Sequence, residues 1–330
     1  MAPDSFKGTF AAAEVAEAIA VGVEAAGGET DRCPVADGGD GTMAVLLGAL
    51  GGERRDALVH DPLRRPIEAG FALLGSGETA VVEMAQASGL SLLAPGERDP
   101  ERADTYGTGE LIAAAICAGA KRVLLAVGGS ATTDGGRGAI EAVRRSEAAF
   151  VLSPPYPRKR TDAEVRIEVL CDVRTPFEDA ARIFAPQKGA DAGAVGRLTA
   201  RLDALAAELP RNPRGIPMTG CAGGLSGGLW AYGAELHPGA EFVLDALDFD
   251  SRLARADAVV SGEGRFDPQS LEGKIVGAIA ERCAAAGKPL HLIVGQNALR
   301  SGAPAAVESI AEAGDPDSIR RGAADLARCV

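Results

Sequence analysis

The stretch RVLLAVGGSATTDGGRGAIEAVRR, residues 122–145, decides the fold. Its apolar run at 123–127 predicts a buried strand, its glycine-rich run at 128–136 a loop, and the pattern after Gly138 a helix. Glycines let a backbone approach a ligand closely, and the N–H groups at the start of a helix point towards that ligand. The stretch therefore predicts an α/β fold with an anion-binding loop, although a tight turn without a ligand fits this one loop as well.

Repetition of the pattern favours a binding site over a turn. The chain has five more glycine-rich loops that contain charged or hydroxyl side chains, and several of these loops follow a predicted strand. Strands that alternate with helices predict a mainly parallel sheet, whose ligands collect at the carboxyl ends of the strands. An antiparallel hairpin is predicted in addition, with strands at 57–59, 67–74 and 79–84.

Composition excludes several classes of protein. A length of 330 residues favours two domains, and a net charge of −12 argues against nucleic acid or a membrane surface as the main partner. The six cysteines are widely spaced without a C-x-x-C motif, which indicates free thiols and neither a zinc site nor a disulfide framework. Because we find neither a signal peptide nor an apolar run of ~20 residues, we expect a cytoplasmic protein.

Three familiar motifs are absent or incomplete. No G-x-x-x-x-G-K-[ST] occurs, and two G-x-G-x-x-G candidates have Ile112 and Asp267 at the last glycine position. The sequence GLSGG at 224–228 matches the nucleophile elbow of serine hydrolases, with Ser226 as the nucleophile. An elbow requires a preceding strand, whereas residues 218–223 are typical of a loop, so a hydrolase is the less favoured alternative.

Phosphoryl transfer needs cations and backbone N–H groups for the phosphates, carboxylates for Mg²⁺, and a carboxylate that orients the acceptor hydroxyl. The glycine-rich loops contain all three. Their cations are Lys7, Lys188, Lys274 and Arg265. Their carboxylates are Asp4, Asp37, Asp40, Asp134, Asp172, Glu263 and Asp267. Each aspartate alone is more often a turn residue than a catalyst, and it is their recurrence in several loops that indicates a site.

Nine motifs in order resemble the type-1 glycerate kinase family over nearly the whole chain. They are APDSFKG at 2–8, ADGGDGT at 36–42, ASGL at 87–90, YGTGELI at 106–112, GGSATTDGG at 128–136, CDV at 171–173, PQKGA at 186–190, AGGL at 222–225 and GEGRFD at 262–267. The resemblance implies two α/β domains, one of them flavodoxin-like with a parallel sheet, and an active site in the interdomain cleft. We place the flavodoxin-like domain at residues 1–60 plus 250–330 and the inserted domain at 61–249.

The resemblance also implies the reaction, which is transfer of the γ-phosphoryl group of ATP to D-glycerate, with the 2-hydroxyl favoured. ATP and Mg²⁺ are the implied cofactors, and the expected partners are small molecules, with a monomer or a homodimer left open. Asp40, Thr133 and Ala185 stand where the family usually has Glu, Asn and Gly. The family also has a strand before the APD motif, which we expect to be missing here, so a truncated relative that binds without catalysis is the main alternative.

We assign roles to these positions on chemical grounds. The catalytic set is Lys7, Asp37, Asp134 and Lys188, of which the two lysines neutralise phosphate charge. The substrate-binding set is Asp4, Ser5, Asp40 and Arg265, with Arg265 as a bidentate partner of the glycerate carboxylate and Asp37 or Asp40 orienting its hydroxyl. The phosphate-binding set is Gly128, Gly129, Ser130, Gly135, Gly136 and Lys274. The expected Mg²⁺ ligands are Asp134, Asp172 or Asp267.

Overall fold

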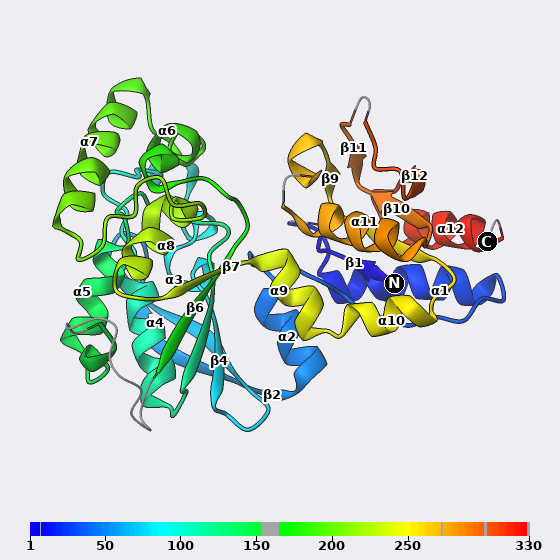
Figure 1. Cartoon of the computed structure of the whole chain (residues 1–330), viewed down its shortest axis with the longest axis horizontal. Helices are drawn as coiled ribbons and strands as arrows, with labels where there is room; N and C mark the ends of the chain where they lie inside the picture. Colours follow the sequence, from blue (N-terminus) through cyan, green and yellow to red (C-terminus); the bar gives the residue numbers. More distant parts are fainter. Residues whose placement is uncertain (7, 153–164, 272, 300–301, 329–330) are drawn as a thin grey trace. The chain divides into compact units, whose positions relative to one another are not determined.

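The computed structural model describes residues 1–6, 8–152, 165–271, 273–299 and 302–328. The chain divides into two compact units: unit 1 comprises Met1–Asp37 and Ala240–Val330, and unit 2 comprises Gly38–Gly239 (Figure 1). The sequence placed these boundaries at residues 60 and 250. The first differs because α2 (Thr42–Leu50) packs on β3 (Pro66–Leu74) and β2 (Gly52–His60) pairs with β3 along its whole length, which assigns both elements to unit 2.

Unit 1 is built on a parallel sheet. Its strands lie in the order β1 (Ala2–Pro3), β8 (Val259–Gly262), β10 (Leu290–Val294) and β12 (Val307–Glu312). Residues 33–35 run along the other side of β1, because Cys33 N donates to Met1 O at 2.8 Å and Val35 N donates to Pro3 O at 3.0 Å. This arrangement has the strand order of a flavodoxin-like sheet, with the order reversing between β1 and β8.

The strand that the family has before the APD motif is expected to be missing, and the structure has a short strand, β1, within the motif itself. β1 is two residues long, and Ala2 and Pro3 pair with Ser261 and Gly262 of β8. The Ser261 hydroxyl donates to Ala2 O at 2.7 Å and reinforces the pairing.

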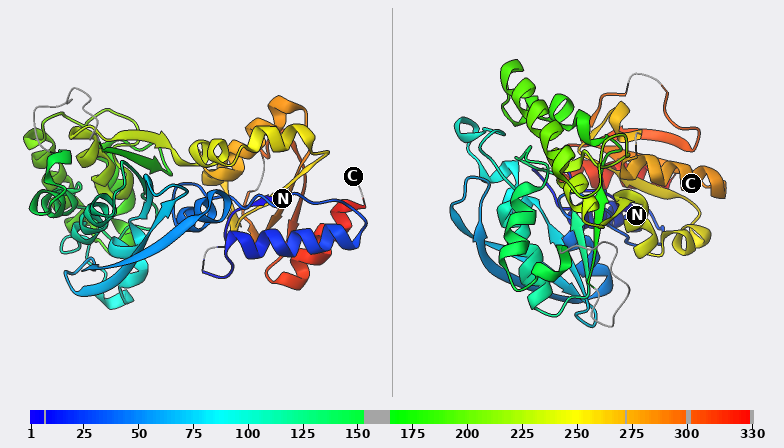
Figure 2. Two further views of the ribbon diagram at one scale, coloured as in Figure 1. Left: turned by 90° about the horizontal axis from the view of Figure 1, so that it is seen from below. Right: turned by 60° about the vertical axis from the view of Figure 1, so that its left-hand side comes forward.

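Helices cover both faces of this sheet (Figure 2, left). α1 (Ala12–Ala25) and α12 (Pro316–Ala327) pack together on one face, and α10 (Phe249–Arg255) and α11 (Ile275–Ala286) pack on the other. The predicted four-residue spacing of Val15, Ile19 and Val23 is confirmed as the buried face of α1. A Cβ at Gly22 would lie 2.2 Å from Arg320 O, so glycine is what allows α1 and α12 to approach this closely.

Unit 2 contains a mixed six-stranded sheet in the order β2, β3, β4 (Thr79–Glu83), β5 (Arg122–Ala126), β6 (Arg166–Cys171) and β7 (Glu235–Pro238). The first three strands are antiparallel, which confirms the predicted hairpin, and the rest are parallel. The decisive stretch folds as predicted, because β5 leads through a glycine-rich loop into α5 (Arg137–Arg145). The other main helices are α4 (Tyr106–Cys117), α6 (Ala180–Phe184), α7 (Ala192–Glu208) and α8 (Cys221–Ala231).

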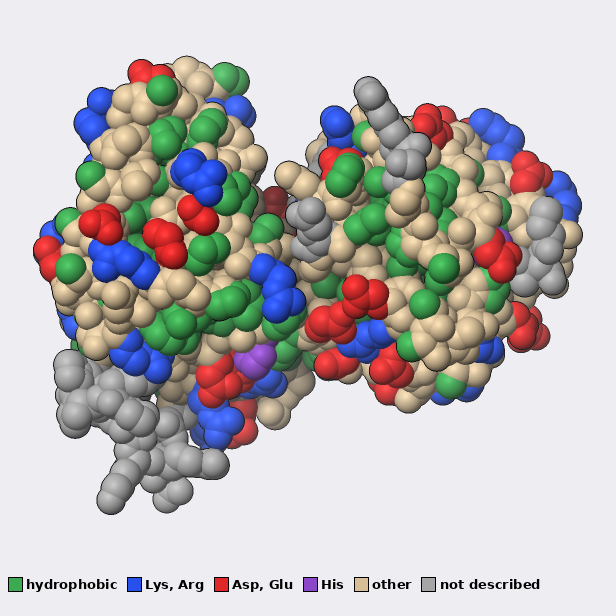
Figure 3. Space-filling view, turned by 45° about the horizontal axis from the view of Figure 1, so that its top comes forward, with side chains coloured by type: hydrophobic (Ala, Val, Ile, Leu, Met, Phe, Trp, Pro, Cys, Tyr) green, Lys and Arg blue, Asp and Glu red, His purple; other side chains and the backbone are tan. Residues whose placement is uncertain are grey.

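The predicted basic linker at 153–161 falls within 153–164, outside the described residues. On the face shown in Figure 3, acidic and basic side chains are interspersed, and the described side chains form no continuous basic surface there. Among the described residues, no helix has both the length and the apolar composition needed to cross a bilayer.

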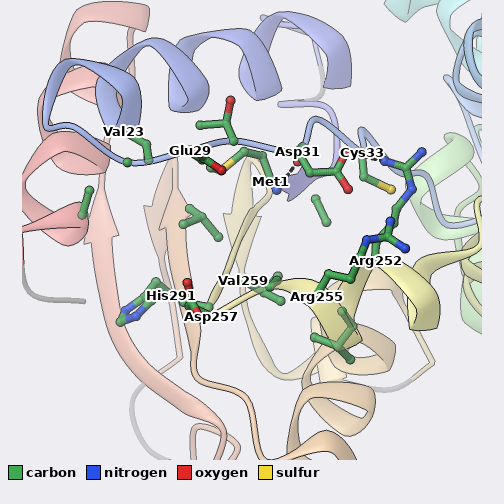
Figure 4. A pocket seen from close by; sticks show the side chains of 18 of the residues that line it. Met1, Val23, Glu29, Asp31, Cys33, Arg252, Arg255, Asp257, Val259 and His291 are labelled. Atoms are coloured by element: carbon green, nitrogen blue, oxygen red, sulfur yellow. Dashed lines mark hydrogen bonds and ion pairs between the residues drawn. The ribbon is translucent and has the colours of Figure 1, made fainter.

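A cavity of about 500 Å³ lies at the amino-terminal end of the unit 1 sheet, and Met1, Cys33, Val259 and His291 are among its lining residues (Figure 4). His291 is only 4% exposed, and its Nδ1 lies 2.8 Å from Ser309 Oγ. Its Nε2 has no hydrogen-bond partner among the residues that the structure describes. Burial lowers the pKa of His291, and the nearby charge of Glu308 opposes this effect.

We expect His291→Asn to remove part of the acid sensitivity of unit 1. Because the folded pKa of His291 is lowered, the unfolded chain binds a proton more readily, and stability falls as the pH drops from ~6.5 towards the folded pKa. Asn keeps a polar atom near Ser309 and does not titrate. Calorimetry at about pH 7.5 and about pH 5.5 measures the difference, and an equal loss of Tm in both proteins would contradict the assignment.

Candidate active site

Two pockets, each within one unit, hold most of the predicted site residues. The first, which we call the Lys188 pocket, is lined in unit 2 by Leu90, Val127, Gly128, Gly129, Ser130, Asp172, Val173, Phe184, Gln187, Lys188 and Ala222. The second, the Glu263 pocket, is lined in unit 1 by Asp4, Ser5, Phe6, Thr9, Asp37, Glu263, Gly264, Arg265, Asp267, Lys274, Gly295, Gln296 and Gly314. They have volumes of about 240 Å³ and about 440 Å³.

The Lys188 pocket lies at the carboxyl ends of two parallel strands. Gly128, Gly129 and Ser130 follow β5, and Asp172 follows β6. Positions 128 and 129 leave no room for a side chain. A Cβ at Gly128 would lie 2.6 Å from the Cα of Gly39, and a Cβ at Gly129 would lie 2.8 Å from Asp40 Oδ1. The pocket wall therefore exposes main-chain groups, as an anion cradle requires.

Lys188 supplies a buried cation to this wall. The side chain ends a 3-10 turn, Pro186–Lys188, and is 3% exposed. Its Nζ donates to Ser130 Oγ at 2.8 Å and to Thr132 O at 2.6 Å, which uses two of the three donors of an ammonium group. Desolvation lowers the pKa of Lys188 to about 7, although the carboxylates of Asp134 and Asp172 act to raise it. An incoming anion would restore the charged form.

Asp134 holds the glycine-rich loop in place through hydrogen bonds that its carboxylate accepts. Its Oδ2 accepts from Thr105 N, Thr105 Oγ1 and Gly138 N at 3.0, 2.8 and 3.0 Å, and its Oδ1 accepts from Gly136 N at 3.1 Å. These bonds join the loop to the starts of α4 and α5. Because an ionised carboxylate has roughly four lone-pair sites, little capacity is left for a metal ion. Gly135 and Gly136 have positive φ values of 65° and 78° and lie outside the pocket lining.

The Glu263 pocket gathers the residues that follow every strand of the unit 1 sheet. Asp4 and Ser5 follow β1, Glu263 follows β8, Gly295 follows β10, Gly314 comes shortly after β12, and Asp37 comes two residues after segment 33–35. The pocket thus lies at the carboxyl edge of the sheet, where the strand order reverses. In doubly wound sheets, ligands bind at this point.

Both signs of charge line the Glu263 pocket. Asp4 and Asp37 are buried, whereas Arg265 is exposed and Lys274 is half-buried. Arg265 Nε lies 3.4 Å from Asp267 Oδ2, and Asp267 Oδ1 accepts from Gln269 N at 2.9 Å in a local turn. The two cations can bind a carboxylate, and the acidic oxygens can accept hydrogen bonds from hydroxyl groups. The pocket therefore suits a small hydroxy acid.

The structure brings the predicted residues together in two sets. Gly128, Gly129, Ser130, Asp172 and Lys188 share the Lys188 pocket, whereas Asp4, Ser5, Asp37, Arg265, Asp267 and Lys274 share the Glu263 pocket. Lys274, predicted with the phosphates, thus lies with the predicted glycerate residues. Asp40, predicted with glycerate, lies beside Gly129. Lys7 is outside the described residues.

No specific role for Glu263 follows from the sequence alone, although the residue comes shortly after a predicted strand. The structure also disfavours the hydrolase alternative, because Ser226 is completely buried in α8 and its Oγ donates to Met218 O at 2.6 Å. The loop expected before Ser226 is confirmed, because residues 218–220 form turns and Ala222, Gly223 and Gly224 have positive, non-helical φ values at a kink in α8. A nucleophile in this position has no access to a substrate.

The family model "Glycerate kinase family" matches residues 1–146 and 156–325. The glycerate kinase of Bacillus subtilis (strain 168) is 39% identical over 323 residues, which cover 89% of this chain and 84% of that protein. The glycerate 2-kinase of Escherichia coli (strain K12) is 36% identical with the same coverage. A crystal structure named as a glycerate kinase 2, from Salmonella typhimurium LT2, superimposes with a TM-score of 0.81 at 32% identity and covers 99% of this chain and 96% of its own. This chain belongs to the glycerate kinase family.

Proposed function

We propose that the protein transfers the γ-phosphoryl group of ATP to a hydroxyl group of D-glycerate and releases phosphoglycerate and ADP. The observation that carries the proposal is the Lys188 pocket, in which a buried ammonium group lies against a bare-backbone loop at the ends of β5 and β6. The 2-hydroxyl is the favoured acceptor, because a relative 36% identical to this chain is named a glycerate 2-kinase.

The Lys188 pocket would hold the phosphate groups of ATP. Its volume of about 240 Å³ is below the usual ~300–1,000 Å³ of a pocket for a complete drug-sized ligand, so it suits the polyphosphate part of the nucleotide. Lys188 and the N–H groups of the 128–130 loop would bind phosphate oxygens there. The positive charge and fixed donors would stabilise the charge that moves onto the leaving oxygen.

The donor set fits Mg²⁺ that arrives with the nucleotide. Among the described residues, no group of three or more His, Cys, Asp or Glu could hold a metal ion. Asp172, half-buried in the Lys188 pocket, can supply one carboxylate, and Mg²⁺ in such sites is usually held by one or two carboxylates together with phosphates and water. When bound, the ion neutralises phosphate charge. Asp172 is our choice, because it lines the Lys188 pocket, whereas Asp134 lies outside that lining and Asp267 lines the Glu263 pocket.

The Glu263 pocket would bind glycerate. Arg265 and Lys274 would pair with its carboxylate, and Asp4, Ser5 and Asp37 would accept or donate hydrogen bonds to its hydroxyl groups. The reaction would then depend on residues of both pockets, because one supplies the phosphate contacts and the other the acceptor contacts. The described cysteines, which include the buried Cys33 and Cys171, are free thiols, in support of our proposal of a reducing, cytoplasmic compartment.

A coupled ADP-release assay with D-glycerate, ATP and Mg²⁺ tests the proposal, with L-glycerate and glycerol as controls. We expect turnover with D-glycerate and only background with the controls. Phosphorus NMR of the product distinguishes 2-phosphoglycerate from 3-phosphoglycerate. Binding of ATP and D-glycerate without turnover, in a cooperatively folded protein, would support the alternative of a non-catalytic relative and refute the kinase.

We expect Asp172→Asn to raise the Mg²⁺ concentration required for half-maximal rate by about tenfold, the equivalent of ~1.4 kcal/mol. Asn keeps the size of the side chain but removes the negative charge that attracts the ion. The rate is measured at saturating ATP as a function of free Mg²⁺. Asp179→Asn is the matched control. Asp179 belongs to the same unit, its carboxylate pairs with Arg182, and it does not line the Lys188 pocket. An unchanged Mg²⁺ requirement in Asp172→Asn would remove this residue from the site.

A further inference from the structure

The proposed function leaves two carboxylates of the Glu263 pocket without a role. One is Asp267, which is engaged with Arg265 and Gln269, and the other is Glu263. Its main chain is fixed from both sides: Asp4 N donates to Gly262 O at 2.8 Å, and Gly295 N donates to Glu263 O at 3.0 Å. A Cβ at Gly262 would lie 1.9 Å from Ile293 O, so β8 and β10 are in backbone contact at this residue. The position of Glu263 is therefore set by β1, β8 and β10 and not by a loose loop.

The side chain of Glu263 has an oxygen available for a ligand. Its Oε1 is buried and has no hydrogen-bond partner within the described part of the chain. In Asp4, by contrast, Oδ1 accepts from Ser5 N at 2.6 Å. Buried acceptors in native proteins are nearly always hydrogen-bonded, and an exception requires an explanation. A hydroxyl group of a bound substrate is a donor that would satisfy this oxygen.

The surroundings of Glu263 adjust its protonation to neutral pH. Burial raises the pKa of Glu263 to about 7, and the like charges of Asp37 and Asp267 act in the same direction. The hydrogen bond with Ser270 and the ammonium group of Lys274 act in the opposite direction. A carboxylate with a pKa near the working pH is well matched to accept a proton and release it again.

We propose that Glu263 is the general base of the reaction, which removes the proton from the acceptor hydroxyl of D-glycerate. The inference rests on the proposed function. In the step, the hydroxyl oxygen forms a bond to the γ-phosphorus while the bond from that phosphorus to the bridging oxygen of ADP breaks. The hydroxyl proton passes to Glu263 Oε1 and later to solvent. Arg265 and Lys274 hold the substrate carboxylate in the same pocket, and this contact orients the hydroxyl.

Three variants test the assignment in the coupled assay with D-glycerate. Glu263→Gln keeps the shape of the side chain and cannot accept the proton, so we expect kcat to fall by about 10²-fold or more. KM should change by less than about threefold, because the neutral amide still binds a hydroxyl group. Glu263→Asp retains a base at a longer distance and should be intermediate. Glu281→Gln, an exposed residue of α11, is the matched control and should match the wild type.

The pH profile separates a base from a merely structural residue. In the wild type, kcat/KM for D-glycerate should fall about tenfold per pH unit below pH ~7, as Glu263 becomes protonated. This acidic limb should persist in Glu263→Asp and disappear in Glu263→Gln. Circular dichroism and Tm show whether each variant is folded. If Glu263→Gln fails to fold, the kcat and pH profile of Glu263→Asp provide the test.

Each other outcome overturns the assignment. Wild-type kcat and an unchanged acidic limb in Glu263→Gln would show that another group takes the proton. A raised KM with normal kcat would make Glu263 a binding residue only. Absence of turnover in the wild type, with every hydroxy acid tried, would refute the proposed function and this inference together. This outcome differs from a failure of the inference alone, because the wild type and Glu281→Gln would then be equally inactive.

Discussion

Lys188→Ala is expected to lower kcat for D-glycerate phosphorylation by about 10³-fold. The Nζ of Lys188 is buried against Ser130 Oγ and Thr132 O, so it has a fixed position and little water around it. Charges in such surroundings act more strongly than exposed ones, because the local dielectric constant is low. On the proposed function, removing the ammonium group would leave the charge on the transferring phosphoryl group without a buried cation beside it.

Lys121→Ala is the matched control for this measurement. Lys121 belongs to the same unit, and its Nζ pairs with Glu78 at the surface, where an ion pair contributes little. Its rate should stay within about twofold of the wild type. Lys188→Arg should not restore activity, because the larger guanidinium group does not fit the buried position. If Lys188→Ala kept more than about a tenth of the wild-type kcat, the Lys188 pocket would not be the phosphate site.

Asp134→Ala is expected to destabilise unit 2 by about 4 kcal/mol. Its carboxylate accepts hydrogen bonds from the main chain of Thr105, Gly136 and Gly138 and from the Thr105 hydroxyl, and all these donors are buried. An unsatisfied buried donor costs ~1–3 kcal/mol, and water that enters the space recovers part of this loss. The single tryptophan, Trp230, lies in unit 2, so its fluorescence in urea reports the relevant transition.

Two comparisons make this result specific. Asp134→Asn keeps an acceptor for some of the bonds and should lose about half as much stability. Asp203→Ala on α7 removes an exposed carboxylate that pairs with Arg214, and it should change stability by less than about 0.5 kcal/mol. A wild-type transition in Asp134→Ala would mean that the starts of α4 and α5 do not depend on this carboxylate.

Much of the fold could be predicted because it depends on local patterns. The spacing of Val15, Ile19 and Val23 identified α1, and the apolar run before Gly128 identified β5 with its following loop. Asp172 and Lys188 could be proposed as neighbours of that loop because each lies in a motif with the chemistry that phosphate requires. The helix and strand predictions needed only periodicity, whereas the placement of Asp172 and Lys188 at the phosphate site also used the resemblance to the glycerate kinase family.

The grouping of the remaining site residues depends on contacts between distant segments, which periodicity does not report. Lys274 resembles a phosphate-binding lysine next to Gly273, yet the sheet order places it with Asp4 and Asp37. Asp40 belongs beside Gly129 because β5 and the 38–41 loop are joined by a hydrogen bond from Val127 N to Gly38 O at 3.0 Å. The saturated carboxylate of Asp134 depends on Thr105, 29 positions earlier in the chain.

Unit 1 is assembled from both ends of the chain, and this has a consequence for its synthesis. β1 is translated long before its partner β8, which begins only at Val259. At ~5–20 residues per second, the emerging segment Met1–Asp37 must wait roughly 10–45 s on the ribosome before its neighbour exists. Unit 2 is continuous from Gly38 to Gly239 and can fold in that interval. Until β8 and β10 have been made, the apolar residues that α1 buries in the folded unit, such as Val15 and Ile19, have no sheet to pack against.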